Sequence, residues 1–254
     1  MNTKENKKNI IDVHNLTAGY QDFLILEDVS FSVQKGEIFI ILGGSGCGKS
    51  TLLKILTGLL EPINGDVLIN DKDIYNCHEN VKKSILKNIG VMFQSGALFG
   101  SMNLLENIKL PLITHTSLDQ EAMNLIAYMK LSLVGLKDSA MFMPDQISGG
   151  MRKRAAIARA MALDPEIIFL DEPSAGLDPV TAAQLDQLII NLAENLGITF
   201  IMVTHELESI FDTGQRVIML DKETKGIIAE GNPHDLKNHK ENKKVFTFFN
   251  RLAD

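Results

Sequence analysis

The chain has 254 residues, of which 45% are hydrophobic and 22% charged, values typical of one globular domain with a sizeable core. Its net charge of -7 excludes a nucleic-acid binder with a broad basic surface, because clustered lysine and arginine must neutralise phosphates. Two cysteines, Cys47 and Cys77, are too far apart for a CxxC motif and indicate a reducing compartment. We expect no signal peptide in the polar segment 1–8, and no apolar run approaches the ~20 residues of a membrane-spanning helix. We therefore expect a soluble protein that reaches a membrane only through a partner.

Short apolar runs bounded by turn residues predict strands along the whole chain. They cover residues 28–33, 38–42, 66–70, 90–94, 166–170, 198–203 and 217–220. The first alternates apolar and polar residues, as half-buried strands do, whereas 38–42 is continuously apolar, as in a strand covered on both faces. Helices are expected over 50–59, over most of 103–163, and around an amphipathic segment with Leu185, Leu188, Ile189 and Leu192 on one face. Strands that alternate with helices predict a mostly parallel α/β sheet.

The same pattern predicts how the chain is divided. We expect a single domain over 1–254, with a core formed by residues 1–94 and 165–240. A helical subdomain is expected over 95–164 and a helical tail over 241–254. The lysine-rich stretch 237–244 is interpreted as a solvated surface helix.

A phosphate-binding motif follows the second predicted strand. Residues 43–50 read Gly-Gly-Ser-Gly-Cys-Gly-Lys-Ser and fit G-x-x-x-x-G-K-[ST], with a buried strand before and a helix after. Glycines let successive N–H groups point at phosphates, Lys49 would reach the β- and γ-phosphates, and Ser50 would ligate Mg²⁺. A glycine-rich turn with a chance lysine is the alternative, which the order of strand, loop and helix disfavours. The residues predicted to bind nucleotide here are Gly43, Gly44, Ser45, Gly46, Cys47, Gly48, Lys49, Ser50 and Thr51.

The position of Cys47 inside this loop carries its own expectation. A thiol reagent should block activity, and ATP should protect against it, with a thiol that points away from the ligand as the alternative.

A second set of candidate residues ends the apolar run 167–170. Asp171 and Glu172 follow it, and buried carboxylates are costly unless they meet a partner or a metal. Asp171 would hold the Mg²⁺ shell, and Glu172 would act beside the γ-phosphate as general base or water-orienting group. A strand end that simply reaches solvent is the alternative, which the phosphate-binding loop argues against.

Between these two motifs lies the segment Ile147-Ser148-Gly149-Gly150-Met151, just before a helix that begins Arg-Lys-Arg. Ser148 and the N–H groups after it would form an anion cradle at a helix N-terminus. A flexible loop before a basic helix face is the alternative, but the position between the two motifs disfavours it. The segment resembles the ABC signature, whose usual form is Leu-Ser-Gly-Gly-Gln.

The remaining ABC motifs are matched in order, and the resemblance extends from residue 10 to about 236. It implies that Tyr20 stacks on adenine, although a lone tyrosine is otherwise an ordinary surface residue. It also implies that Gln94 of the Q-loop touches Mg²⁺ or the attacking water. Asp178 of the D-loop would act across a dimer interface, and the switch histidine, His205, would contact the γ-phosphate.

The resemblance to ABC ATPases further implies a fold and a mechanism. The expected fold is a P-loop NTPase (RecA-like) α/β core with an N-terminal antiparallel β subdomain and an inserted α-helical signature subdomain. Such proteins work as head-to-tail dimers, in which each ATP lies between the phosphate loop of one subunit and the signature of the other. We expect a homodimeric, Mg²⁺-dependent ATPase, because one chain carries all the motifs for two complete sites. The isolated subunit should be a weak ATPase that needs a second copy and a membrane partner.

Two segments are similar to the Mla-type (Mce-associated) phospholipid-transport ATPases. One is the Q-loop stretch 93–99 with Asn107 after it; the other has Met151 in place of the usual glutamine, followed by Arg152 and Arg154. This resemblance implies transport of phospholipids between membranes. The implied partners are a membrane permease and an Mce-type lipid-binding subunit. The implied location is cytoplasmic, on the cytoplasmic face of the inner membrane through the permease.

Two apolar groups have alternative interpretations. Residues after Gln94 would either form a groove for a coupling helix of the permease or pack the helical subdomain internally; they are Ala97, Leu98, Phe99, Leu104 and Leu105. Side chains of the tail would either engage the neighbouring subunit or cap this chain's own core; they are Phe246, Phe248, Phe249 and Leu252.

Three other functions compete with phospholipid transport. An ABC importer for another solute usually carries glutamine at the position of Met151. A soluble ABC ATPase of translation or DNA repair has tandem domains or a long coiled-coil insertion, and neither is present in this sequence. A P-loop kinase for a small molecule would not need the Ser148-Gly149-Gly150 segment or His205.

Overall fold

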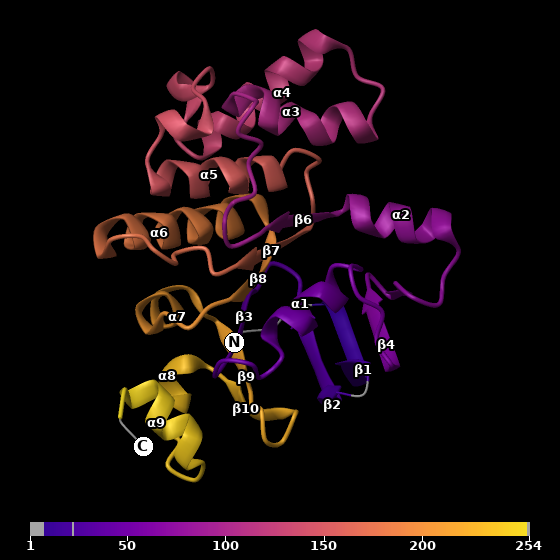
Figure 1. Ribbon diagram of the computed structural model, residues 1–254, viewed down its shortest axis with the longest axis vertical. Coiled ribbons are helices and arrows are strands. Elements are labelled where there is room, and N and C mark those ends of the chain that lie inside the picture. The colour runs from indigo at the N-terminus through magenta and orange to yellow at the C-terminus, as the bar shows by residue number, and fades with distance from the viewer. Residues whose placement is uncertain (1–7, 22, 253–254) are drawn as a thin grey trace, which may run out of the picture.

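The computed structural model describes residues 8–21 and 23–252. Residues 1–7 of the segment expected to carry no signal peptide, and residues 253–254 of the predicted tail, lie outside the described residues. Over the described residues the strands form two sheets, one of four strands and one of six (Figure 1). No helix in this part of the chain is both long and apolar enough to cross a membrane.

The six-stranded sheet has the order β10-β9-β3-β8-β7-β6. Its parallel strands are β3 (Ile38–Gly43), β6 (Ile89–Met92), β7 (Ile167–Asp171), β8 (Thr199–Val203) and β9 (Arg216–Leu220). β10 (Ile227–Gly231) closes one edge and is antiparallel to β9. Every residue of β3 and β8 is buried, as expected for apolar strands covered on both faces. The predicted mostly parallel sheet is confirmed.

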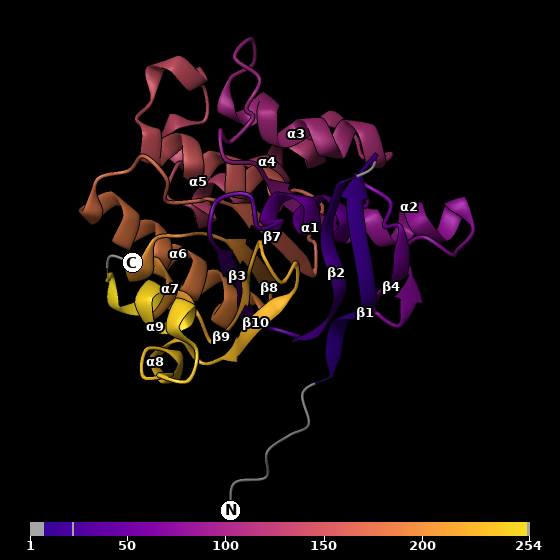
Figure 2. The same cartoon turned by 60° about the horizontal axis from the view of Figure 1, so that its bottom comes forward.

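The second sheet is antiparallel and has the order β2-β1-β4-β5. Its strands are β1 (Asn9–Tyr20), β2 (Phe23–Gln34), β4 (Asn64–Ile69) and β5 (Lys72–Asp73). β1, β2 and β4 stand beside the larger sheet in Figure 2. This is the expected N-terminal antiparallel β subdomain.

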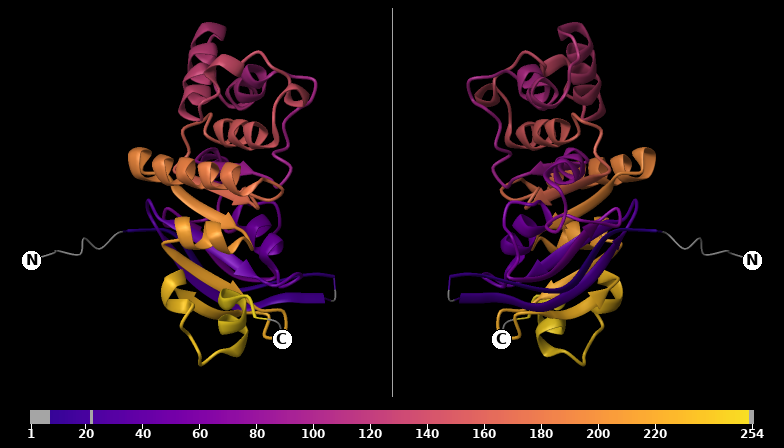
Figure 3. Two further views of the ribbon diagram at one scale, coloured as in Figure 1. Left: turned by 90° about the vertical axis from the view of Figure 1, so that its left-hand side faces the viewer. Right: turned by 90° about the vertical axis from the view of Figure 1, so that its right-hand side faces the viewer.

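Helices cover both faces of the six-stranded sheet (Figures 1 and 3). Ile38, Ile40 and Leu42 of β3 belong to a core shared with α6 (Pro179–Leu196) and α7 (Leu207–Thr213). Phe39 and Ile41 of the same strand face a second core, shared with α1 (Lys49–Leu56) and the antiparallel sheet. The alternation of side chains along β3 therefore joins both layers into one unit. The predicted apolar face of α6 is buried at positions 185, 189 and 192.

The segment between β6 and β7 is helical and forms its own lobe above the sheet (Figure 3). It contains α3 (Leu104–His115), α4 (Gln120–Leu133), the 3₁₀ turns η1 (Lys137–Ser139) and η2 (Pro144–Gln146), and α5 (Gly149–Ala160). α3 begins with a capping box between Asn103 and Glu106, which satisfies backbone N–H groups at its start. α2 (Glu79–Lys87) precedes β6. The expected helical insertion is present.

The structure decides between the two interpretations of the apolar residues after Gln94. Leu104 is 0% exposed and Leu105 8% exposed, and both belong to the core that the helical lobe shares with β3, α6 and α7. Leu98 is partly buried against the same core, whereas Ala97 is exposed and Phe99 is 49% exposed. The leucines therefore pack internally, and a groove made from all five residues was a wrong prediction.

The carboxy-terminal part also corrects a prediction. The lysine-rich stretch 237–244 is not one helix, because α8 (Pro233–Leu236) ends before it and α9 (Lys243–Asn250) begins at its end. Asn242 caps α9 by accepting from the N–H groups of Lys244 and Val245 at 3.1 and 3.3 Å. Residues 237–242 contain no apolar stripe that could pack a helix against the core. The helix α9 therefore begins only at the Asn242 cap.

The tail helix α9 packs on this chain's own core. Phe249 is 2% exposed, and its ring lies 5.9 Å from that of Phe211 on α7. Phe246 and Phe248 are partly buried, whereas Leu252 is 52% exposed. Capping of the chain's own core, one of the two interpretations, is therefore correct for Phe249.

Candidate nucleotide-binding site

The register of the parallel strands brings the main candidate residues to one edge of the sheet. Ile41 of β3 and Asp171 of β7 both lie opposite Val203 of β8. The phosphate-binding loop after β3, the acid pair at the end of β7 and His205 after β8 therefore leave the sheet side by side. Carboxyl ends of parallel strands are where open α/β sheets bind ligands.

The loop 43–48 has a backbone that only glycine adopts easily. Gly43 has φ 148°, and a Cβ there would lie 2.4 Å from the carbonyl oxygen of Leu220. Gly48 has φ 105° and caps α1 without any side-chain hydrogen bond. The N–H groups of the first turn of α1 therefore remain available to an anion at the helix N-terminus.

Lys49 lies over this loop. Its Nζ donates to the carbonyl oxygens of Gly43 and Gly44 at 2.7 and 3.0 Å. The Ser50 residue is exposed, whereas Thr51 is only 6% exposed, so Thr51 has its backbone rather than its side chain to offer. The arrangement places a cation and the start of a helix around the same space, which suits a phosphate group.

The Cys47 side chain is buried, although its Sγ atom lies 3.9 Å from the Nζ atom of Lys49. Cys47 is 1% exposed and packs in the core with Leu52, and burial raises the pKa of its thiol. A Cβ on Gly43 would lie 2.6 Å from the Cys47 Sγ atom, so the thiol sits beneath the loop. The structure therefore argues against the expected reactivity of Cys47, because burial disfavours the thiolate, which is the reactive form.

We expect a thiol reagent to label Cys77 and to spare Cys47 in the folded chain. Cys77 is partly exposed, whereas Cys47 is buried. Titration with Ellman's reagent should release one equivalent before denaturation and a second only in guanidinium chloride. Rapid reaction of both thiols in the native protein would contradict this placement.

Glu172 is held in an unusual conformation next to His205. Its φ of 48° is left-handed, which costs a non-glycine residue about 1–2 kcal/mol. Its Oε1 lies 2.8 Å from the Nδ1 atom of His205, and its Oε2 is buried without a hydrogen-bond partner among the described residues. A buried carboxylate oxygen needs a donor. A water molecule that attacks a phosphate would supply one, so the pair fits a hydrolytic site.

His205 is the more open member of this pair. Its side chain is 58% exposed, and its Nε2 atom is 3.6 Å from the Oε1 atom of Glu206, too far for a hydrogen bond. One face of the ring is thus held by Glu172 while the other nitrogen faces outward. The imidazole can contact a ligand without losing its contact with Glu172.

Asp171 is partly buried at the end of β7. Burial raises the pKa of its carboxyl group and the Glu172 charge raises it further, while Lys153, Lys49 and Lys54 act in the opposite direction. The ionised form is therefore destabilised in the nucleotide-free chain. A carboxylate in that state fits a divalent cation that takes oxygen ligands.

The raised pKa of Asp171 predicts a stability effect of Asp171→Asn. A carboxyl whose folded-state pKa is raised stabilises below its unfolded pKa, and this stability is lost as the pH rises through the folded-state pKa. At pH 7 without nucleotide we expect Asp171→Asn to raise the Tm by on the order of 2 °C. The difference from wild type should shrink as the pH falls toward the ordinary value of 3.8. Calorimetry over this pH range is the measurement, and a lower Tm of the variant at pH 7 would refute it.

The Q-loop is anchored by side chains that sequence analysis did not assign. Lys153 Nζ donates to the carbonyl oxygen of Gln94 at 2.5 Å, and Arg159 donates to that of Ala97 at 2.6 Å. Asn107, 0% exposed, accepts from the N–H of Phe99 at 2.8 Å. The Gln94 residue itself is exposed. The sequence held a signal for the burial of Lys153. Apolar residues follow it at the helical spacings of three, four and seven residues, which places the lysine on the apolar face of α5.

The signature residues form the start of α5. Ser148 caps the helix and accepts from the N–H of Met151 at 3.2 Å. Gly150 packs against α6, because a Cβ there would lie 2.4 Å from the Cγ2 atom of Thr181. Met151 is partly buried against the core of the lobe, so this position is used for packing. Asp178 caps α6 by accepting from the Thr181 N–H at 3.0 Å, and the Thr181 side chain together with this N–H lowers the pKa of its carboxyl.

The structure does not bring all the candidate residues together. α5, with Ser148 to Met151 at its start, lies in the helical lobe, while α1 and its loop lie on the far side of β6 and β7 (Figures 1 and 3). Tyr20, 41% exposed at the end of β1, lies near α1, with Lys54 Nζ 5.9 Å from its ring. One chain thus carries a phosphate-binding half and a separate signature half.

These two halves, in this order along the chain, decide the family. Residues 26–175 match the family model described as ABC transporter. The chain belongs to the ABC transporter family. It is the ATP-binding and ATP-hydrolysing subunit of such a transporter.

Among curated proteins, the chain is similar to two phospholipid-transport subunits. It is 39% identical over 229 residues to the intermembrane phospholipid transport system ATP-binding protein MlaF of Haemophilus influenzae, covering 90% of this chain and 86% of that protein. It is 35% identical to MlaF of Escherichia coli K12, covering 97% of this chain and 90% of that protein. It is also 46% identical to the probable ribonucleotide transport ATP-binding protein mkl of Mycobacterium bovis, over 78% of this chain but only 55% of that protein.

Solved structures share the fold. The ATP-binding cassette MJ0796, solved as a dimer in a post-hydrolysis state with ADP and Pi, is 32% identical with a TM-score of 0.78, covering 87% of this chain and 98% of that chain. CbiO1 of Clostridium perfringens, part of the transporter complex CbiONQ, is 29% identical with a TM-score of 0.82, covering 96% of each chain. The predicted P-loop NTPase fold is confirmed.

Proposed function

We propose that this ATPase moves phospholipids between membranes as part of an Mla-type system. The observation that carries the proposal is the similarity to MlaF of Haemophilus influenzae over 90% of the chain. Met151 supports the same proposal, because a methionine in place of the usual signature glutamine is the feature by which the sequence resembles the Mla-type ATPases. The proposed partners are a permease and an Mce-type lipid-binding subunit.

A different solute is the second candidate. The mycobacterial protein mkl, named for ribonucleotide transport, is 46% identical over 197 residues. The chain spans 55% of that protein, so less of its length supports the comparison. We therefore rank ribonucleotide transport below phospholipid transport.

Purification of the tagged chain from its native membrane separates these candidates. We expect a permease and a single-span lipid-binding subunit to copurify. The complex, reconstituted in liposomes, should then move a fluorescent phospholipid to acceptor vesicles or take it from them in an ATP-dependent manner. Uptake of labelled ribonucleotide without phospholipid movement would favour the second candidate, and Glu172→Gln controls for ATP dependence.

We propose these roles for the site residues. Gly43, Gly44, Ser45, Gly46, Cys47, Gly48 and Thr51 would offer backbone N–H groups to the phosphates, with Cys47 acting through its backbone alone. Lys49 would bind the β- and γ-phosphates and Tyr20 would stack on adenine. Mg²⁺, held by Ser50, Asp171 and Gln94, would neutralise charge on the phosphates.

The hydrolytic step is assigned to Glu172 and His205. The buried, unpartnered Oε2 of Glu172 supports a role as acceptor of a hydrogen bond, and then of a proton, from the attacking water. The contact between Oε1 and His205 Nδ1 orients the carboxylate, while the outward Nε2 atom of His205 is left to contact the γ-phosphate. Gln94 would contact the same water.

A second copy of the chain would complete each site. The separation of α5 from α1 supports a head-to-tail homodimer, in which Ser148, Gly149, Gly150 and Met151 bind the triphosphate held by the partner. Asp178, at the start of α6, would act across the same interface. MJ0796, a solved neighbour, is a dimer. The triphosphate then stabilises the closed dimer, and its hydrolysis removes that stabilisation.

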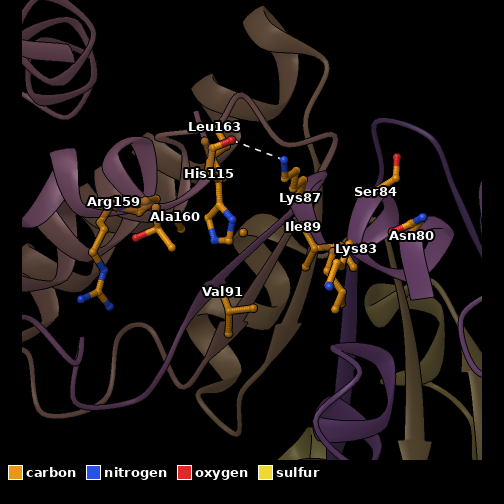
Figure 4. Close-up of a pocket in the computed structure, with 14 residues that line it drawn as sticks. Asn80, Lys83, Ser84, Lys87, Ile89, Val91, His115, Arg159, Ala160 and Leu163 are labelled. Carbon is orange, nitrogen blue, oxygen red and sulfur yellow. Dashed lines mark hydrogen bonds between the residues drawn. The ribbon is translucent and has the colours of Figure 1, made fainter. Parts of the chain in front are cut away.

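A cavity of about 900 Å³ lies between α2, the edge strand β6 and the ends of α3 and α5 (Figure 4). Its walls carry Lys83, Lys87 and Arg159 beside the apolar side chains of Ile89 and Val91. We propose that a short helix of the permease docks there. Its acidic side chains would face the three basic residues of the cavity, and its apolar side chains would face the two apolar ones. This placement replaces the groove expected after Gln94. It would hold the chain on the cytoplasmic face of the inner membrane.

Arg159 connects that cavity with the Q-loop. It lines the cavity, and its guanidinium donates to the carbonyl oxygens of Gly96 and Ala97 at 3.1 and 2.6 Å. A docked helix whose acidic side chain attracts the Arg159 guanidinium would therefore change the hydrogen bonds that hold the segment after Gln94.

A further inference from the structure

A buried lysine of α5 joins two motifs that are far apart in the sequence. Lys153 is 8% exposed, and its Nζ donates to the carbonyl oxygen of Gln94 at 2.5 Å and to that of Glu172 at 3.1 Å. Gln94 follows β6, and Glu172 follows β7, the neighbouring strand. One ammonium group thus connects the signature helix, the Q-loop and the acid pair.

This burial is unfavourable unless the bonds serve a purpose. An ammonium is strongly hydrated, and burial lowers the pKa of Lys153, while the nearby carboxylates of Asp171 and Glu172 raise it. Nonpolar residues otherwise fill the buried face of α5, including Ala156 and Ile157. An apolar side chain at position 153 would avoid the desolvation but would leave two carbonyl groups without this donor.

The lysine is held in place by close packing of its helix on β6. A Cβ at Gly90 would lie 2.4 Å from the carbonyl oxygen of Ala160, and one at Gly96 would lie 3.4 Å from the Cβ atom of Ala156. The backbone of α5 therefore approaches β6 and the Q-loop too closely to shift without moving them. The Lys153 side chain extends from this fixed helix toward the ends of two strands.

The bond to Glu172 acts at a strained residue. Glu172 has φ 48°, and its carbonyl oxygen accepts from Lys153 while its N–H donates to Val203 at 2.8 Å. The carbonyl oxygen also accepts from the N–H of Ala175 at 3.3 Å, so Lys153 supplies the shorter of these two bonds and ties the residue to the helical lobe. Loss of the Lys153 bond would leave this carbonyl with the long bond inside its own turn, so the peptide after Glu172 would relax and the carboxylate would move with it.

We propose that Lys153 is a positioning residue for ATP hydrolysis. It holds the Q-loop and the backbone of Glu172 in one arrangement, so that a movement of the signature helix reaches both at once. The proposal rests on the proposed roles of Glu172 and Gln94 in hydrolysis. Lys153 acts through these residues and does not touch the nucleotide.

The test is Lys153→Met in the complete transporter complex. Methionine is of similar length and has no donor, so we expect kcat to fall about 10- to 100-fold, the loss of a hydrogen bond to a charged group. The KM for ATP should stay within about twofold, because Lys49 and the phosphate loop are intact. Hydrogen exchange should accelerate in the peptides covering 93–99 and 171–176.

Lys130→Met is the matched control. Lys130 is 7% exposed in the same helical lobe and is paired with Asp164, far from the Q-loop in sequence. It should lower the Tm without changing kcat or exchange in those two peptides. Equal losses of kcat in both variants, or a kcat of Lys153→Met within twofold of wild type, would overturn the proposal.

Two further measurements keep the test decisive. If Lys153→Met does not fold, Lys153→Gln replaces it. The shorter glutamine amide reaches one of the two carbonyl oxygens, so we expect a smaller loss of kcat at constant KM. An unchanged kcat of Lys153→Gln refutes the proposal. Normal turnover of Glu172→Gln would overturn the proposed role of Glu172. The exchange comparison would still test the link made by Lys153.

Discussion

Glu172→Gln is expected to lower ATP turnover by about 10²- to 10⁴-fold, the contribution of a positioned general base. Glutamine has nearly the same shape and keeps a polar contact with His205, so the strained loop should survive. It cannot accept a proton from water, and its amide is a poor replacement for the unpartnered carboxylate oxygen. ATP affinity should change little, because Lys49 and the loop 43–48 are unaltered.

The measurement is steady-state hydrolysis by the complex together with binding of a fluorescent ATP analogue. Glu206→Gln is the matched control, since Glu206 is the next acidic residue beside His205, and its side chain is 48% exposed. It should hydrolyse ATP at close to the wild-type rate. A normal rate for Glu172→Gln, or equal losses in both variants, would remove Glu172 from the role of base.

Lys49→Ala is expected to act on binding. Its ammonium lies 2.7 and 3.0 Å from two carbonyl oxygens of the loop, at the place where phosphates would lie. Charge-assisted hydrogen bonds contribute about 1.5–3 kcal/mol, so the Kd for ATP should rise about 10- to 100-fold. Hydrolysis at low ATP concentration should fall at least as much.

Lys35→Ala controls for the loss of a lysine. Lys35 precedes β3 at the opposite end from the loop and pairs with Glu166 at 3.0 Å, with its side chain 57% exposed. Its replacement should leave the Kd for ATP unchanged, as expected for an exposed ion pair. An unchanged Kd for Lys49→Ala would mean that the loop does not hold the triphosphate as proposed.

The sequence by itself determined the parallel strands of the larger sheet and the motifs of the site, whereas the strands β1 and β10 were not predicted. Residues 43–50 and 148–151 are recognisable because their function depends on local backbone: glycines that curl a loop, and a serine that caps a helix. The apolar run of β3 and the face of α6 likewise follow from local periodicity. The family could therefore be predicted from residues near one another in the chain.

Only the tertiary structure decided which side chains are buried outside these periodic segments. Cys47 lies beneath its loop because Gly43 and the core close over it, and Leu104 and Leu105 turn inward against helices that follow much later in the sequence. The ammonium group of Lys153 is held by two carbonyl oxygens that lie 59 and 19 residues away in the sequence. Burial and long-range hydrogen bonds depend on segments that meet only after folding, and no local pattern records which segments those are.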